Sequence, residues 1–213
     1  MFRSTLPAAL ALLALAACAG DPPTAPQGAQ PEVAAARVAS QGGEKLSSDV
    51  LAALAQVRRA TARFHDIDKA FEAGYTVWSP DPFATNATCA SDPAGAGQMG
   101  YHLVNVGLRG SPANPGAGDA TIDMLRPEML LYEKRADGKL HLVGVEYLVF
   151  QAAWERVHGV GAAPPTVLGQ PVPLSVHTFT PTGPAIPHYE LHVWLWTSSP
   201  LGMFAPWNPT VSC

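Results

Sequence analysis

The chain has 213 residues, of which 47% are hydrophobic and 14% are charged. This content is enough for one packed core, while a formal net charge of −4 offers no basic surface for nucleic acid. The 21 prolines and 19 glycines indicate short elements and long, shaped loops rather than a helical bundle.

Residues 1–18 follow the pattern of an export signal. Arg3 precedes an apolar stretch that begins near Leu6, and small residues lead to Cys18. A basic region, an apolar region and a small-residue cleavage site together make a secretory signal, and the stretch is shorter than the roughly 20 residues of a transmembrane helix. The order Leu15-Ala16-Ala17-Cys18 resembles a bacterial lipobox, which implies that residues 1–17 are removed and that Cys18 carries lipid. The alternative is an ordinary signal peptide that leaves no lipid.

The lipobox resemblance implies a protein exported to the cell envelope and held to a membrane through the lipid on Cys18. Ala19 after the cysteine favours the outer membrane, facing the periplasm or the surface. Residues 18–46 are rich in proline and lack any helical or strand period, which predicts a flexible tether. Residues 47–213 are then expected to form a single folded domain.

The folded part begins with a helical pattern. Ser47 or Ser48 is suited to cap a helix. Apolar side chains then recur at three- and four-residue steps over Val50–Phe71, and Gly74 fits a left-handed cap. This pattern predicts one amphipathic helix, or two helices broken near His65-Asp66.

From Met99 onward the hydrophobic period changes to two, which predicts half-buried strands. Ala136-Asp137-Gly138 is a hairpin signal, and a short helix is expected at Gln151–His158. The order predicts an α+β fold, with an N-terminal helix or helix pair on a curled, mainly antiparallel sheet or barrel of about five strands. The expected strands are Met99–Val106, Glu128–Lys134, Lys139–Phe150, Leu174–Thr180 and His188–Trp196.

Motifs on these strands resemble those of an uncharacterised family of exported bacterial proteins. They are Met99-Gly100-Tyr101-His102-x-x-Asn105, Pro127-Glu128-x-Leu130-Leu131-Tyr132-Glu133, Val143-Gly144-Val145-Glu146-Tyr147, His188-Tyr189-Glu190-Leu191-His192-Val193-Trp194 and Asn208-Pro209-x-Val211-x-Cys213. The resemblance spans roughly residues 64–213 and implies an architecture without implying an activity.

Once Cys18 carries lipid, Cys89 and Cys213 are the two remaining thiols. Disulfides persist in the oxidising compartments that exported proteins enter. We therefore expect a Cys89–Cys213 bond, which would fix the C-terminus to the body of the fold. The alternative is a pair of free thiols.

The segment from His188 to Trp196 is the best candidate for chemistry. A strand places His188, Glu190, His192, Trp194 and Trp196 on one face and apolar side chains on the other. Imidazole and carboxylate groups bind zinc, iron, manganese or copper. This face is therefore expected to form the wall of a metal or ligand pocket.

The strand geometry limits which residues can share an ion. Residues four apart on a strand have Cα atoms roughly 13 Å apart, so His188 and His192 cannot easily share one ion, whereas Glu190 can join either. On a helix the two histidines would be neighbours. The strand is favoured because the segment is short, aromatic and preceded by Pro187.

Further ligands must come from other strands. His102 is the first choice, because Gly100 beside it permits a close backbone approach. In a two-residue hairpin Glu146 lies opposite Met129 and on the other face from Glu128, although a one-residue bulge would reverse this. The expected metal ligands are His102, Glu146, Glu190 and His192, with His188 and Glu128 as alternates.

Three functions are consistent with these patterns. The first is a protein whose pocket holds a divalent metal ion such as zinc, either for catalysis or for binding alone. The second is a non-catalytic binding protein for a small molecule, with Tyr101, Trp194 and Trp196 as the binding wall. The third is a structural envelope lipoprotein. No standard catalytic motif assigns a reaction.

Four histidines have no partner at a spacing that suits a metal site, and they are expected to be structural. They are His65, His141, His158 and His177.

Overall fold

The computed structural model describes residues 46–77, 89–179 and 183–213, which all belong to one unit. The predicted export signal, Cys18 and the tether up to residue 45 lie outside the described residues. The helices are α2 (Ser48–Thr61), η1 (Ala62–His65), α3 (Ile67–Glu72), α4 (Val106–Arg109), η2 (Pro115–Ala117) and α5 (Gln151–His158). The strands are β1 (Thr76–Val77), β2 (Ala90–Ser91), β3 (Gln98–Val104), β4 (Met129–Lys134), β5 (Leu140–Phe150), β6 (Thr166–Val167), β7 (Gln170–Pro171), β8 (Leu174–Thr178) and β9 (Ala185–Val193). In these ranges no helix combines the length and the apolar character that a bilayer crossing requires.

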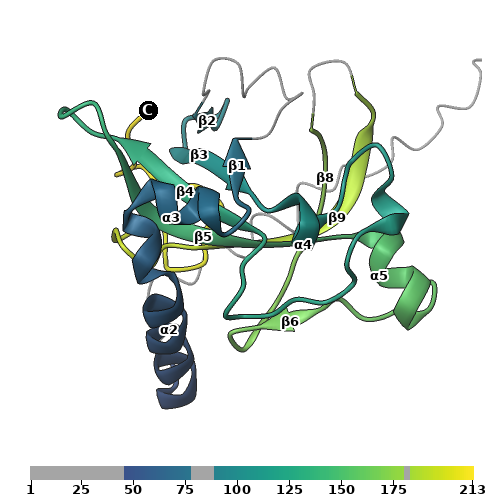
Figure 1. Ribbon diagram of the computed structural model, residues 1–213. Helices are drawn as coiled ribbons and strands as arrows, with labels where there is room; N and C mark the ends of the chain where they lie inside the picture. The colour runs from purple at the N-terminus through teal and green to yellow at the C-terminus, as the bar shows by residue number, and fades with distance from the viewer. Residues whose placement is uncertain (1–45, 78–88, 180–182) are drawn as a thin grey trace, which may run out of the picture. The chain divides into compact units, whose positions relative to one another are not determined.

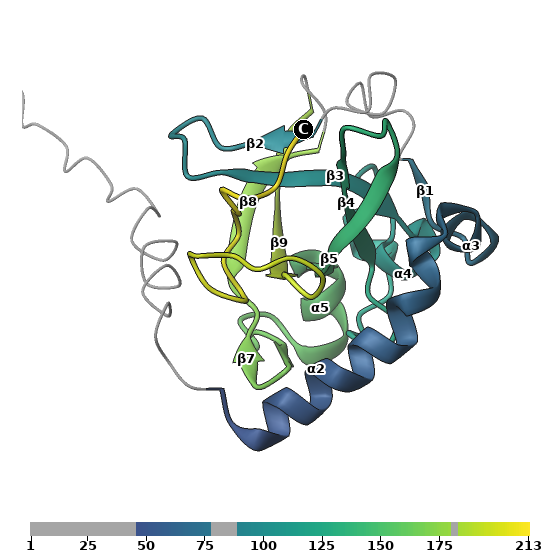
Figure 2. The same cartoon turned by 90° about the vertical axis from the view of Figure 1, so that its left-hand side faces the viewer.

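An antiparallel sheet forms the centre of the fold (Figure 1). Its strands follow the order β1-β3-β4-β5-β9-β8, and β2 pairs with β3 outside this path. The sheet curls, so that β3 runs across the direction of β8 and β9 (Figure 2). The predicted α+β fold with a curled antiparallel sheet is confirmed. The path has six strands in the described residues, because the short β1 joins the five that were expected.

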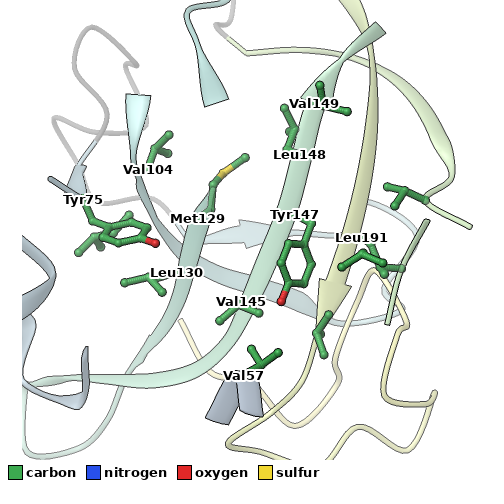
Figure 3. Packing of buried hydrophobic residues seen from close by; sticks show 14 of the residues in the cluster. Val57, Tyr75, Val104, Met129, Leu130, Val145, Tyr147, Leu148, Val149 and Leu191 are labelled. Carbon is green, nitrogen blue, oxygen red and sulfur yellow. The ribbon is translucent and has the colours of Figure 1, made fainter. Parts of the chain in front are cut away.

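The N-terminal helices pack on one face of this sheet. Ser47 caps α2 by accepting a hydrogen bond from the backbone N–H of Val50 at 3.3 Å. The predicted break is present, because Asp66 leaves the helical conformation between η1 and α3. From α2, Val57 points toward Val145 and Tyr147 of β5 (Figure 3). The sheet face that carries Val145 and Tyr147 is therefore the face that α2 covers.

The alternation on β9 follows the sequence prediction. Tyr189, Leu191 and Val193 are buried in the main core. The residues between them point to the opposite face, because successive side chains of a strand alternate. Their partners on β5 share that face, and the pairs are Glu146 with His192, Leu148 with Glu190 and Phe150 with His188.

Two irregularities of the β4–β5 hairpin cancel each other. The loop has three residues, Ala136–Gly138, with Gly138 at φ +75° and Arg135 N–H donating to Lys139 O. The pairing then shifts by one, because Leu131 lies opposite Gly144 while Tyr132 lies opposite Leu142. As a result Met129 lies opposite Glu146, as predicted, although the predicted two-residue loop is wrong.

The C-terminal segment covers part of the sheet face that lies away from α2. The strand ends at Val193, three residues before the predicted end. The regular pairing with β5 stops there, because Trp196 N–H donates to Val143 O, one residue later than the β5–β9 register would place that donor. Trp194 and Val211 form a small second core with Leu131 and Val143. The predicted Cys89–Cys213 pair lies at disulfide distance, with Cα atoms 5.3 Å apart, and fixes the chain end beside β2.

Candidate metal centres

Histidine and glutamate side chains from four strands gather on the sheet face that lies away from α2. They form two groups of three residues, and the ligand atoms in each group lie within 4.8 Å of one another. The central cluster contains His102 of β3, Glu146 of β5 and His192 of β9. The edge cluster contains His177 of β8, the last strand of the sheet, with His188 and Glu190 of β9.

The central cluster has the dimensions of a metal site. His102 Nε2 lies 3.2 Å from Glu146 Oε2, and His192 Nε2 lies 3.5 Å from the same oxygen. The two imidazole rings are nearly perpendicular, with centroids 6.0 Å apart. Four ligands at about 2.0–2.1 Å from a tetrahedral zinc ion are separated from one another by about 3.3–3.4 Å. The nitrogen–oxygen distances are therefore those of neighbouring ligands on one ion.

The polar atoms of the central cluster are buried, which costs free energy unless a binding partner satisfies them. The side chains of Glu146 and His192 are each 2% exposed, whereas that of His102 is 23% exposed. Within the described residues, Glu146 Oε2 and His192 Nε2 make no hydrogen bond of good geometry. Unsatisfied buried polar groups cost free energy. A cation between these two atoms would satisfy both of them, and it would remain accessible on the His102 side.

The protonation states suit a cation. Burial raises the pKa of Glu146, but the nearby His192 and His102 outweigh this effect and hold that pKa below its usual value. Burial lowers the pKa of His192, an effect that outweighs the opposing one of Glu146. A charged carboxylate and a neutral imidazole are the forms in which these residues bind metals.

Two glycines help to bring the ligands together. Gly100 has φ +86°, and a Cβ atom there would lie 2.5 Å from Tyr132 O, so the predicted close approach beside His102 is present. A Cβ atom at Gly144 would lie 2.7 Å from Val193 O. Larger residues at these positions would push β3 from β4 and β5 from β9, and those are the strands that carry the central cluster.

The structure brings together three of the four predicted ligands, namely His102, Glu146 and His192. Glu190 lies elsewhere, because its carboxylate turns along β9 toward His188, with Oε2 3.2 Å from Nε2 of that ring. The alternate His188 therefore belongs to the edge cluster. The alternate Glu128 belongs to neither cluster, because its Oε2 accepts a hydrogen bond from the backbone N–H of Leu148 at 3.1 Å.

His177 is the residue that the sequence reasoning missed. It lies opposite Ile186 in the β8–β9 pair, on the same face as His188, and its Nε2 is 3.0 Å from Nε2 of His188. Its position three residues before the end of a predicted strand was a signal. The register with β9 depends on the segment 179–184, whose sequence carries no standard hairpin motif.

The three predicted ligand-binding aromatics do not form a common wall. Trp194 is 1% exposed, and its Nε1 donates to Ala205 O at 2.7 Å. Beyond the end of β9, Trp196 packs against the main core and against the ring of His65. Tyr101 lies next to His102 in the strand, so its side chain points to the other face.

No protein-family model matches this chain, and no curated protein or solved structure is significantly similar to it. The resemblance to an exported bacterial family therefore stays a prediction.

Proposed function

We propose that this protein is an exported divalent-metal-binding protein and that the central cluster holds one ion, with zinc as the first candidate. His102, Glu146 and His192 would supply one ligand atom each. The observation that carries the proposal is the meeting of Glu146 Oε2 and His192 Nε2, both buried and without a good hydrogen bond in the described part of the chain.

The ligand atoms suit a metal ion of intermediate hardness that keeps one coordination position open. Two imidazoles and one carboxylate suit zinc, and they also suit iron or manganese. Three protein ligands leave a tetrahedral ion one further position, which water or a small molecule would take. The partly exposed ring of His102 marks the side from which such a ligand would approach.

The location of the protein is part of the same proposal. The lipobox Leu15–Cys18 supports export and a lipid anchor, with the folded domain held at the envelope. The Cys89–Cys213 pair at disulfide distance supports an oxidising compartment. A scavenging or ligand-binding role at the envelope agrees with this placement.

Metal analysis of the purified full chain tests the proposal. Protein prepared in chelator-free buffer is analysed by mass spectrometry for bound metals, and EDTA-stripped protein is titrated with Zn²⁺, Mn²⁺ and Fe²⁺. Glu146→Gln keeps the shape of the side chain and removes its charge. We expect it to bind one ion fewer, with an affinity loss larger than the roughly 10–100-fold that losing an outer-shell partner costs.

A matched control separates this effect from general damage. Glu133→Gln makes the same chemical change at a buried strand carboxylate that pairs with Arg135 and belongs to neither cluster. It is expected to keep the wild-type metal content. Equal metal content and affinity in wild type and Glu146→Gln, with both proteins folded by circular dichroism, would refute the central site. Ligand-dependent tryptophan fluorescence would then separate a small-molecule binder from a structural lipoprotein.

A further inference from the structure

We propose that the edge cluster of His177, His188 and Glu190 is a second, independent site for a divalent transition-metal ion. This inference goes beyond the proposed function, because the edge cluster shares no ligand with the central cluster. It requires only the edge of the sheet, where β8 pairs with β9.

The ligand atoms of the edge cluster form a compact triangle. His188 Nε2 lies 3.0 Å from His177 Nε2 and 3.2 Å from Glu190 Oε2, and His177 Nε2 lies 3.4 Å from the same oxygen. These three distances are close to the roughly 3.3–3.4 Å that separates neighbouring ligands around tetrahedral zinc. All three ligand atoms thus have the spacing that a single ion imposes.

Hydrogen bonds to the backbone set the tautomer of both rings. His188 Nδ1 lies 2.7 Å from Ile186 O, and His177 Nδ1 lies 3.2 Å from Thr178 O. A carbonyl oxygen only accepts, so each Nδ1 carries the hydrogen, and a neutral ring directs the lone pair of Nε2 into the cluster. An N–H donated to a carbonyl is also the usual outer-shell arrangement of a metal-binding histidine.

Three acceptors therefore meet at the edge cluster. Two Nε2 lone pairs and a carboxylate oxygen repel one another unless a cation lies between them. That cation is a metal ion or a proton shared by the two rings. A proton on the two rings would make them cationic, with Glu190 as the counter-ion, whereas a metal ion would bind all three atoms at once. The metal is proposed because all three atoms have the spacing of ligands on one ion.

The surroundings fit an exchangeable ion. The side chain of His188 is fully buried, and the rings of Phe150 and Phe179 lie against it. The side chain of His177 is 48% exposed on the last strand of the sheet. One side of the cluster is thus dry and fixed, while the other opens to solvent, so an ion would enter and leave past His177.

A Zn²⁺ titration of the EDTA-stripped full chain tests this inference. We expect wild type to bind two equivalents, His177→Ala to lose the edge equivalent and Glu146→Gln to lose the central one. His177 is a suitable target because it lies on the last strand of the sheet and its side chain is half exposed. His141→Ala is the matched control, since His141 is a part-exposed strand histidine that pairs with Asp137 and belongs to neither cluster.

The outcomes for the two sites are distinguishable. Two equivalents with unchanged affinity in His177→Ala would overturn the edge site and leave the central site intact. Two equivalents in Glu146→Gln would overturn only the central site. Nitrogen NMR of Glu146→Gln then distinguishes metal from proton at the edge. Zn²⁺ should shift the Nε2 signals of His177 and His188, whereas signals that respond to pH and not to Zn²⁺ would overturn the proposal.

Discussion

Glu128 is a buried carboxyl group that makes the stability of the protein depend on pH. Burial raises its pKa from the ordinary 4.5 to about 8, against the opposing effect of the hydrogen bond from the Leu148 N–H. At neutral pH the folded chain therefore holds a proton on Glu128 that the unfolded chain has released. Because the folded state binds more protons, the free energy of unfolding falls as pH rises from about 4.5 to about 8.

The size of this effect follows from the width of that window. The contribution of Glu128 to the slope is about 1.4 kcal/mol per pH unit, or about 2–3 kcal/mol between pH 5 and pH 7. Glu128→Gln has no such proton, while its amide oxygen can still accept from Leu148 N–H. We therefore expect the variant to gain about 2–3 kcal/mol relative to wild type between pH 5 and pH 7.

Urea denaturation at several pH values measures this difference. Both proteins are stripped of metal and kept oxidised, so that the other titrating groups contribute equally and cancel in the comparison. Glu72→Gln makes the same change at an exposed helix position beside Lys69 and should run parallel to wild type. If Glu128→Gln also ran parallel to wild type from pH 5 to pH 8, Glu128 would have the same pKa in both states and the reasoning would be wrong.

Two further predictions concern the chain ends. Cys213→Ser removes a link between residues separated by 124 positions. Urea denaturation should then show that the free energy of unfolding falls by about 4–5 kcal/mol, while the far-ultraviolet circular dichroism spectrum stays unchanged. A fall below about 1 kcal/mol, or quantitative alkylation of both thiols in the native protein, would contradict this prediction. Cys18→Ala should give an unprocessed or soluble protein in membrane fractionation, whereas unchanged partitioning and gel mobility would rule out the lipid anchor.

Short sequence patterns predicted most of the fold, because helix ends and strand faces depend on interactions between residues that are close in the chain. The helix break follows from Asp66, whose side chain caps α3, and the helix at Gln151–His158 ends at Gly159, whose φ is +96°. The alternation of β9 also predicted which of its residues share a face. The strand geometry also predicted that His188 and His192 cannot easily share one ion, and the two residues belong to different clusters.

The parts that the sequence could not predict depend on register and rotamer. The pairing of Glu146 with His192 requires the β5–β9 register, and 34 residues of loop, helix and strand lie between Phe150 and Ala185. Glu190 has a histidine two residues away on either side, and only packing decides which one it faces. The position of Trp194 depends on where the C-terminal segment crosses the sheet, and no short-range pattern encodes that crossing.

The disulfide has a consequence for a chain that is cut. All six cluster residues lie between Cys89 and Cys213, so the bond closes a ring that contains both candidate sites. Val160, after α5, is 92% exposed between two glycines and offers a protease an accessible peptide. Cleavage there would put His102 and Glu146 on one fragment and the other four residues on a second. The ring would become an open chain whose two pieces stay joined. A nicked molecule would then keep all six residues of the two proposed sites in one covalent unit until a reductant separates the pieces.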